Sequence, residues 1–363
     1  MNAIRMLLAV LPFSLILVLA TFEISGGASL EEVVRGLERL GREQRFQQQI
    51  EGAKREKKLV VYTSTQAAET QERVNAFKKK YPFITEVDSY RSSQHRILTR
   101  LTTESRAKRY LADVVDMNGS TIHLVKKEGL LGRYPSMEGD LLPKGFKDPD
   151  SYWAAENIRP YVLEYSSRLV PRQGVPRKLV DLLNDAWKGK LALDEREYVW
   201  FANILNVLGE RKGLDFMKRL ARQGINLRGG HSLLSQLVAA GEFPINIVQY
   251  AHIAQRSIRA GAPVDWVGLD PVITDFHSIA LMANAPHPYT ATLYIDFALS
   301  EEGQRLLARR GFIPARVGVG SDPPRLTTDL KLVPMDLKLL DDLQRYTQLF
   351  EETFSKKSRG SRK

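Results

Sequence analysis

Hydroxyl-bearing and cationic side chains gather in several short loops of the 363-residue chain. Most of these loops follow a short apolar run and precede a stretch with helical spacing, which indicates a strand that leads through a loop into a helix. The helix N-terminus in such a unit offers unpaired N–H groups and the positive end of a dipole, so the arrangement suits a small anion. The candidate ligand-binding residues are Thr63, Ser64, Thr65, Arg91, Ser92, His95, Asn118, Ser120, Tyr198, Arg228, His231, Gln249 and Tyr250.

Several of these candidates also have a simpler interpretation. The hydroxyls of residues 63–65 could do no more than cap the following helix, and His95 could be a surface or capping histidine. Arg228 could be a solvated arginine in a plain turn. Tyr198 could line a cleft or belong to the core. Residue types alone leave these alternatives open.

Apolar runs predict the strands that carry these loops. Three successive strand–helix units in the first half indicate a mostly parallel sheet, and ligands on such sheets bind at the carboxyl ends of the strands. The fold class that we predict is therefore α/β. The expected strands are Leu59–Tyr62, Ile84–Tyr90, Ala112–Asp116, a long crossing strand within Tyr152–Leu169, Lys190–Asp194, Ile225–Leu227, Ile245–Val248, Val264–Val267 and a return crossing within Val272–Met282.

Composition narrows the class of protein. The length favours two domains, and a hydrophobic content of 43% with 26% charged residues is typical of a soluble globular protein. The net charge of +11 would suit an anionic partner. The chain has no zinc-finger spacing and no aromatic-glycine RNA-binding signature, so we expect no nucleic-acid partner. The absence of cysteine excludes disulfides, thiol catalysis and a lipid-anchoring cysteine.

The two ends of the chain read as segments outside the main fold. Arg5, an apolar run over residues 6–20 and the small residues at 26–28 predict a signal peptide over 1–28 that directs the protein to the periplasm. An uncleaved anchor is the alternative. Residues 29–58 are expected to form a helical segment on the first domain. Residues 355–363 form a basic tail.

The segment Ala283–Arg316 has the most specific sequence pattern of the chain. It predicts a helix entered through Pro286 and Pro288, then a second helix capped by Ser300. It resembles the closing helices of type II periplasmic solute-binding proteins of the iron(III)-transport and family 1 kind, and the resemblance covers roughly residues 50–354. The resemblance implies two lobes with mostly parallel sheets, joined by two crossings. Lobe 1 would comprise residues 59–155 and 275–354 with the C-terminal helices, and lobe 2 residues 156–274.

The resemblance also implies a function. Such a protein would be the monomeric, periplasmic binding component of an ABC importer, with no enzymatic activity and no cofactor beyond its transported ligand. That ligand would be a small anion or Fe³⁺, with or without a synergistic anion. The partners would be permease and ATPase subunits, and contact with the membrane would be through the permease or an uncleaved signal anchor. The alternatives are a ligand-sensing module that signals to a membrane receptor, and an enzyme on the same scaffold.

The choice between iron and an anion depends on two positions. Members of the family that bind ferric iron have a carboxylate near the position of His95 and two adjacent tyrosines where this chain has Tyr250 and Ala251. The metal candidates are therefore Tyr250 and His95. Ferric ion prefers several anionic oxygens, which one phenolate and one imidazole do not supply. A carboxylate, a phosphonate, a phosphate ester or a metal–anion complex suits the chain better.

Overall fold

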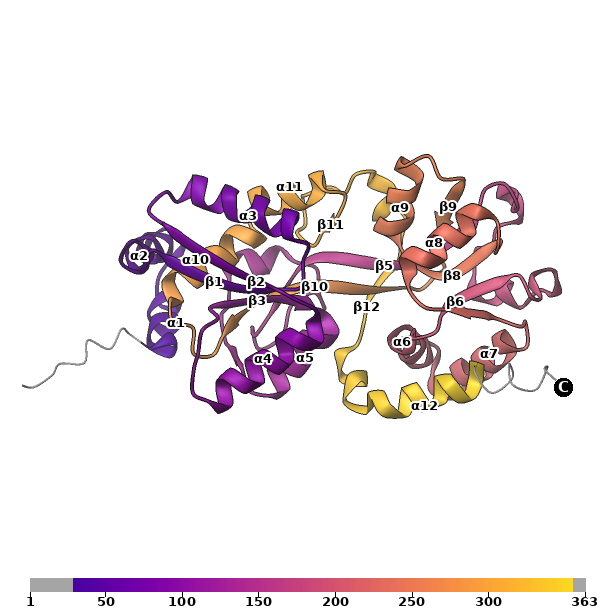
Figure 1. Cartoon of the computed structure of the whole chain (residues 1–363), viewed down its shortest axis with the longest axis horizontal. Coiled ribbons are helices and arrows are strands. Elements are labelled where there is room, and N and C mark those ends of the chain that lie inside the picture. Colours follow the sequence, from indigo (N-terminus) through magenta and orange to yellow (C-terminus); the bar gives the residue numbers. More distant parts are fainter. Residues whose placement is uncertain (1–28, 355–363) are drawn as a thin grey trace, which may run out of the picture.

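The computed structural model describes residues 29–354 (Figure 1). The predicted signal peptide and the basic tail lie outside the described residues. Within the described part, no helix combines the length and the apolar character that crossing a bilayer requires. The molecule has two lobes of mixed α/β structure that lie side by side along its long axis, which confirms the predicted fold class (Figure 1).

The first lobe begins with three parallel strands in the order β2–β1–β3, each followed by a helix. Apolar and β-branched residues form the inner strands β1 and β3, because both faces of these strands are covered. These elements are β1 (Lys58–Thr63), α3 (Ala67–Lys80), β2 (Glu86–Arg91), α4 (Gln94–Arg106), β3 (Val114–Asn118) and α5 (Gly119–Lys127).

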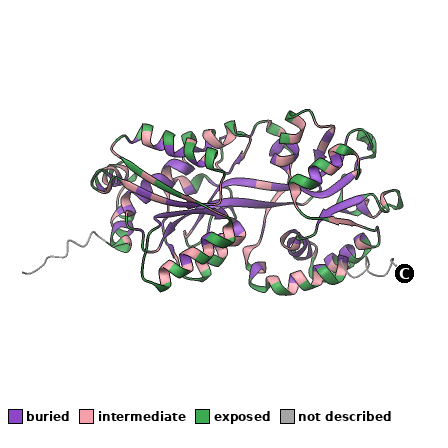
Figure 2. Ribbon diagram, in the orientation of Figure 1, coloured by how far each residue is buried: buried purple, intermediate pink, exposed green. Residues whose placement is uncertain are grey.

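Two long strands connect the lobes, as the sequence predicts. β5 (Ala154–Ser166) and β10 (Val272–Met282) run antiparallel to each other through the middle of the molecule and are buried almost throughout (Figure 2). β10 also pairs antiparallel with β3. The sheet of the first lobe is therefore mixed where the crossing strands join it.

The second lobe repeats the strand–helix arrangement on the other side of the crossing strands. β6 runs parallel to β7 and β8, whereas β8 and β9 pair antiparallel with β5. Its elements are β6 (Leu191–Asp194), α6 (Tyr198–Leu208), α7 (Glu210–Ala221), β7 (Asn226–Arg228), α8 (His231–Ala240), β8 (Ile245–Tyr250), α9 (Ala251–Arg259) and β9 (Val264–Val267).

The expected N-terminal helical segment consists of two helices, α1 (Leu30–Glu38) and α2 (Arg42–Glu56). α2 packs on α10 (Pro288–Leu299) of the first lobe. The contact is close at Gly52, where an added Cβ would lie 2.1 Å from the ring of Tyr289. Only glycine therefore allows this packing.

The closing helices form as the sequence predicts. Ser300 accepts a hydrogen bond from the backbone N–H of Gly303 and caps α11 (Glu301–Arg309), and Gly311 follows with a positive φ of 79°. β11 (Ile313–Pro314) and β12 (Leu332–Pro334) then pair with the crossing strands.

The last helix, α12 (Leu343–Phe354), packs against α6 and α7 of the second lobe (Figure 1). The ring of Phe350 lies 5.2 Å from that of Tyr198 and 5.7 Å from that of Phe201. The sequence places residues 275–354 with lobe 1, so α12 departs from that division. Its apolar stripe requires a partner surface, but the pattern does not say on which lobe that surface lies. The lobe boundaries stay a prediction.

Short elements fill the connections. The segment from Leu179 to Trp187 consists of two 3₁₀ turns. The short elements are β4 (Leu131–Gly132), η1 (Met137–Leu141), η2 (Arg172–Gly174), η3 (Leu179–Leu183), η4 (Asp185–Trp187), η5 (Pro324–Leu326) and η6 (Leu337–Asp342).

Candidate ligand-binding cleft

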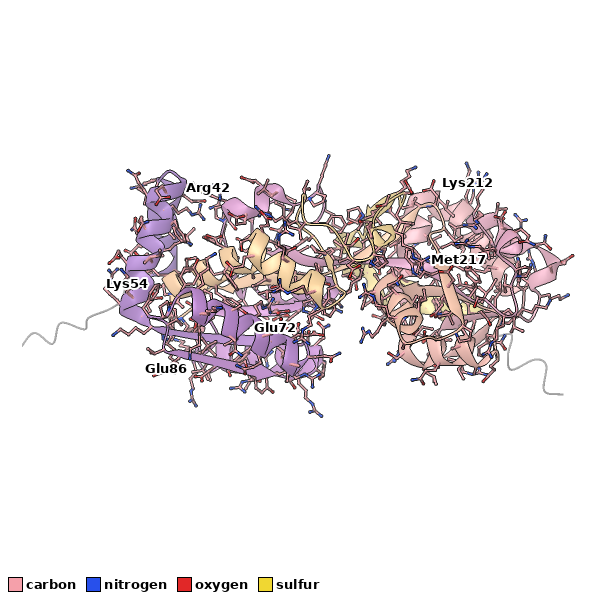
Figure 3. All side chains as sticks on the ribbon, turned by 90° about the horizontal axis from the view of Figure 1, so that it is seen from above. Arg42, Lys54, Glu72, Glu86, Lys212 and Met217 are labelled. Carbon is pink, nitrogen blue, oxygen red and sulfur yellow. The ribbon has the colours of Figure 1, made fainter. Side chains whose placement is uncertain are left out.

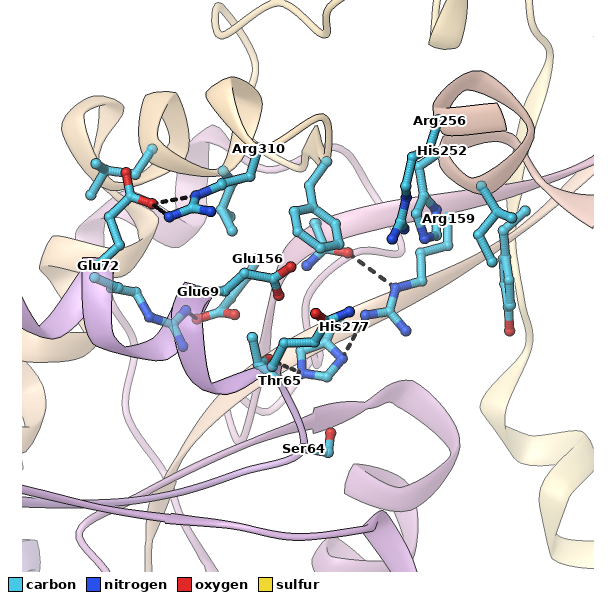
Figure 4. Close-up of a pocket in the computed structure, with 18 of the residues that line it drawn as sticks. Ser64, Thr65, Glu69, Glu72, Glu156, Arg159, His252, Arg256, His277 and Arg310 are labelled. Atoms are coloured by element: carbon cyan, nitrogen blue, oxygen red, sulfur yellow. Dashed lines mark hydrogen bonds and ion pairs between the residues drawn. The ribbon is translucent and has the colours of Figure 1, made fainter. Parts of the chain in front are cut away.

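A cavity of about 300 Å³ opens where the two lobes meet the crossing strands (Figure 4). The loop after β1 and the start of α3 form one wall, together with α11. The start of α9 forms the opposite wall, and β5 and β10 form the floor. Its polar lining includes Ser64, Thr65, Glu69, Glu72, Arg73, Gln94, Glu156, Asn157, Arg159, Ser232, Tyr250, His252, Arg256, His277 and Arg310.

A buried ion cluster closes the first-lobe side of this floor. The guanidinium of Arg73 pairs with the carboxylates of Asp116 and Glu156, and all three side chains are almost fully buried. Burial alone would raise the pKa of Asp116, but His277 and Arg73 outweigh burial and hold that pKa well below its ordinary value. For Glu156 burial dominates and raises the pKa to about 7, with Arg73 as a partial counterweight. The positive and negative charges of the cluster therefore largely cancel one another.

His277 joins this cluster to the second crossing strand. An Nη of Arg159 lies 2.9 Å from Nδ1 of His277, and a guanidinium can only donate, so Nδ1 accepts. The ring proton is consequently on Nε2, which faces Asp116 and lies 3.2 Å from Oγ1 of Thr65. Burial lowers the pKa of His277, in agreement with a neutral ring. Figure 4 shows Arg159, His277 and Thr65 in this chain of contacts.

Tyr250 is the C-terminal residue of β8 and lines the cavity. Its hydroxyl lies 3.2 Å from Oδ2 of Asp275 and 3.3 Å from the hydroxyl of Tyr161. The rings of Tyr250 and Tyr161 are stacked, with their centroids 5.0 Å apart. Burial, followed by the charge of Asp275, raises the pKa of Tyr250 well above its ordinary value. Tyr250 is therefore a protonated phenol in this arrangement.

His252 and Arg256 lie one helical turn apart on α9 and line the same wall. Burial, with Arg159 as the next contribution, lowers the pKa of His252 well below its ordinary value, so this ring is neutral. Arg256 is exposed, and among residues 29–354 its side chain has no hydrogen bond or ion pair. Arg159 likewise has no carboxylate within ion-pair distance in the described part of the chain.

Three buried polar atoms of the lining have no hydrogen-bond partner within residues 29–354. They are Oγ of Ser64 and Nε of Arg73 on the first-lobe side, and Nδ1 of His252 on the opposite wall. An unpaired polar group removed from water costs about 1–3 kcal/mol. A bound molecule with its own polar groups would remove that cost on both walls at once.

The structure brings three of the predicted site residues into the cavity lining, namely Ser64, Thr65 and Tyr250. Others support the same loops from behind. Oγ1 of Thr63 accepts the backbone N–H of Thr65 at 2.9 Å, and Nε of Arg91 lies 3.4 Å from the carbonyl oxygen of Thr65.

The remaining candidates on the first lobe lie outside the lining. The backbone N–H of Ser92 donates to the carbonyl of Thr63, and His95 is an exposed residue of α4. The side chain of Asn118 caps α5 by accepting the N–H of Thr121 at 2.9 Å. Ser120 lies in the first turn of that helix.

The second-lobe candidates other than Tyr250 also lie outside the lining. Arg228 is 3.5 Å from Glu242, and Tyr198 packs on the last helix. His231 pairs with Glu197 at 2.9 Å. Gln249 is buried and donates to the carbonyl of His231 at 2.9 Å and to a buried carboxylate, that of Glu164, at 3.1 Å.

The two metal candidates, Tyr250 and His95, do not share the cavity lining. Within residues 29–354, no group of three or more His, Cys, Asp or Glu side chains is arranged to hold a metal ion. The carboxylates at the floor are already bound to Arg73.

Sequence reasoning did not select Arg159, His252, Arg256 and His277 as site residues. Their spacing offers a partial signal, because residues 252 and 256 must share a helix face directly after the strand that carries Tyr250. Arg159 and His277 lie within the crossing strands, and only the pairing of those strands places them at the floor of the cavity.

A sequence model of the bacterial extracellular solute-binding proteins matches residues 110–331, more than half of the chain. The chain belongs to this family. It is 27% identical over 243 residues to the probable ABC transporter periplasmic-binding protein y4fP of Sinorhizobium fredii, a match that covers 61% of this chain and 66% of the relative. Across the curated relatives that it matches, the chain spans between 41% and 66% of their length.

Solved structures share the two-lobed fold. Iron-bound HitA from Pseudomonas aeruginosa superimposes with a TM-score of 0.69 at 18% identity, covering 82% of this chain and 99% of that chain. The periplasmic binding protein AfuA from Actinobacillus pleuropneumoniae, with fructose-6-phosphate bound, superimposes with a TM-score of 0.65 at 21% identity, covering 82% and 98%. These likenesses confirm the predicted two-lobed architecture.

Proposed function

We propose that the protein is the substrate-binding component of an ABC importer and captures a small anionic solute in the cavity between its lobes. The observation that carries this proposal is the pair of cations at the cavity, Arg159 and Arg256, neither of which has a carboxylate within ion-pair distance among residues 29–354. A guanidinium binds a carboxylate or phosphate through charge-assisted, often bidentate hydrogen bonds. The unpartnered Oγ of Ser64 and Nδ1 of His252 give the same solute further contacts.

A bare ferric ion suits these groups poorly. It would need several anionic oxygens, but Tyr250 is a protonated phenol bound to Asp275 and the floor carboxylates already pair with Arg73. HitA, which shares the fold, is iron-bound, whereas AfuA carries fructose-6-phosphate. Of these two chemistries, the cations of this cavity favour the phosphorylated one. Iron would enter only as a complex with an anion.

Capture would proceed by closure of the two lobes about β5 and β10. Arg256 is carried by the second lobe, and Ser64 with the N-terminus of α3 is carried by the first, so closure would bring complementary groups to opposite sides of the solute. The partners would be a membrane permease and its ATPase, and the protein would work outside the cytoplasm, as its family does. We propose no catalytic role for the cavity.

Native mass spectrometry of the protein purified from the exported fraction, together with elemental analysis, tests this proposal. The expected result is a small anion bound to one protein molecule, with phosphorus or carboxylate chemistry in its fragments. The double variant Arg159→Gln/Arg256→Gln should lose this species while remaining folded. Recovery of one ferric ion with no accompanying anion would contradict the proposal, and turnover of the solute would favour the enzyme alternative.

A further inference from the structure

A group of exposed cations lies at the far side of the second lobe, outside the cavity. Helix α7 buries Phe216, Met217 and Leu220 against the lobe and turns its other face to solvent. In Figure 3 Lys212 lies at the outer surface of the second lobe. The cations on the outer face of α7 and at its C-cap are Arg211, Lys212, Lys218, Arg219 and Arg222.

A neighbouring loop extends this face. The backbone N–H of Gly189 donates to the carbonyl oxygen of Gln223 at 2.6 Å, which holds the loop against the end of α7. Lys188 and Lys190 flank Gly189, and both are exposed. We call these two lysines and the five cations of α7 the α7 basic face.

None of the seven cations has an ion pair or a side-chain hydrogen bond within the described part of the chain. Helices α1, α2 and α11 differ, because four of their seven cations, Arg35, Arg42, Lys54 and Arg305, pair with carboxylates. Three carboxylates are close in sequence to the α7 basic face. Glu210 and Asp215 belong to α7, and Asp185 precedes Lys188. Glu210 is paired with Arg345, so the seven cations outnumber the carboxylates that remain. The whole chain has a net charge of +11, so these seven positive charges are a large part of its excess of cations over anions.

We propose that the α7 basic face binds the headgroups of anionic phospholipids and holds the second lobe against a membrane surface. Basic clusters gain affinity for such membranes from each Lys or Arg near the surface. The centre of a protein interface is instead depleted of charge and enriched in aromatic side chains. Among residues 29–354 the one exposed large aromatic side chain is Tyr110 of the first lobe, so the α7 basic face has no such anchor.

Vesicle co-sedimentation of the full chain tests this proposal with two lipid compositions, phosphatidylcholine alone and phosphatidylcholine mixed with phosphatidylglycerol. The patch variant is Lys218→Gln/Arg219→Gln/Arg222→Gln. The matched control, Arg39→Gln/Arg106→Gln/Arg109→Gln, removes three exposed cations on the first-lobe side that have no ion pair with any residue the structure describes. Glutamine keeps helix propensity, so both variants should retain the wild-type melting temperature.

The expected result is binding to the mixed vesicles that falls with salt, and a loss on the order of tenfold or more in the patch variant. The control should bind like the wild-type chain. All three proteins share the same N-terminal residues, so any binding through those residues is common to them. Solute binding in the cavity should be unaffected in both variants.

Three outcomes would overturn the proposal. One is equal binding to both lipid compositions, and another is an equal loss in the patch and control variants, which would reflect net charge alone. The third is binding of a short DNA duplex at the same salt as tightly as the mixed vesicles, which would make the face a general polyanion site. Should the patch variant fail to fold, Lys188→Gln/Lys190→Gln alters the loop alone and should lower vesicle binding several-fold.

Discussion

The two walls of the cavity differ in how far their polar groups are satisfied. On the first-lobe side, Arg73 is paired with two carboxylates and His277 has partners at both ring nitrogens. On the second-lobe side, Arg256 and Nδ1 of His252 have no partner within residues 29–354. Among residues 29–354, the exceptions on the first-lobe side are Oγ of Ser64 and Nε of Arg73.

This difference separates a structural role from a recognition role. A buried charge that is already paired gains little from a ligand and holds its neighbours in place, whereas an unpaired cation or donor gains a new interaction when an anion arrives. The first-lobe wall and floor therefore provide a rigid base. The second-lobe wall and Arg159 provide most of the groups that would distinguish one solute from another.

The largest effect should come from removing the cation of the buried ion cluster on the first-lobe side, which we call the paired wall. Arg73→Met leaves the carboxylates of Asp116 and Glu156 buried without their cation, and this should lower the free energy of unfolding by about 3–5 kcal/mol. Denaturant unfolding measures the change. The matched control is Arg305→Met, whose partner Glu301 is exposed, and it should cost less than about 1 kcal/mol. Equal costs in the two variants would show that the cluster is not structural.

The pH dependence of stability should also report on the paired wall. Because burial raises the pKa of Glu156 to about 7, between pH 4.5 and 7 the native state holds a proton that the unfolded state has lost. This group alone therefore makes stability fall as pH rises across that window, by up to about 1.4 kcal/mol per pH unit. Glu156→Gln should remove this contribution from the slope. An unchanged slope in urea unfolding between pH 4.5 and 7 would contradict the assignment.

Changes to the second-lobe wall, where Arg256 and Nδ1 of His252 have no partner within residues 29–354, should affect affinity for the solute more than stability. Arg256→Gln removes an exposed cation with no partner in the described chain, so the melting temperature should stay the same. Affinity for the solute should fall by about ten- to a hundredfold, as expected for the loss of a charge-assisted hydrogen bond. Arg228→Gln is the matched control, because Arg228 lies outside the cavity lining, and it should bind normally. Titration calorimetry of both variants distinguishes the two cations.

The smallest effect should come from Tyr250, which has both a structural role and a recognition role. Tyr250→Phe removes the hydroxyl that contacts Asp275 and Tyr161, and it should lower the free energy of unfolding by about 1 kcal/mol. Its affinity for the solute should fall less than that of Arg256→Gln. A greater loss of affinity in Tyr250→Phe would move the centre of recognition from the cations to the phenol. Thermal unfolding and calorimetry on the same samples measure both quantities.

Most strands of the fold are readable from the sequence because they are short apolar runs between loops. The crossing strands and the helices around Ser300 also match the prediction. The side on which α12 packs was not predictable, since an amphipathic stripe names no partner. Contacts of this kind form between segments far apart in the chain, and a local pattern does not encode them.

The site was predictable only where a loop follows a strand close to the crossing strands. Ser64 and Thr65 directly follow β1, and Tyr250 ends β8. Arg228 ends β7, which is the edge strand of the sheet, so its turn lies away from the cavity. Position along a sheet depends on strand order, and one sequence does not reveal strand order.

The most direct test of the account is a calorimetric titration of the co-purifying solute into the wild-type protein and into the double variant Arg159→Gln/Arg256→Gln. Ferric chloride, inorganic phosphate and fructose-6-phosphate serve as additional probes. We predict saturable binding of one phosphorylated or carboxylated solute per protein molecule, with binding lost in the double variant while that variant remains folded. Undiminished binding in the double variant, or tight binding of ferric ion without any anion, would contradict it.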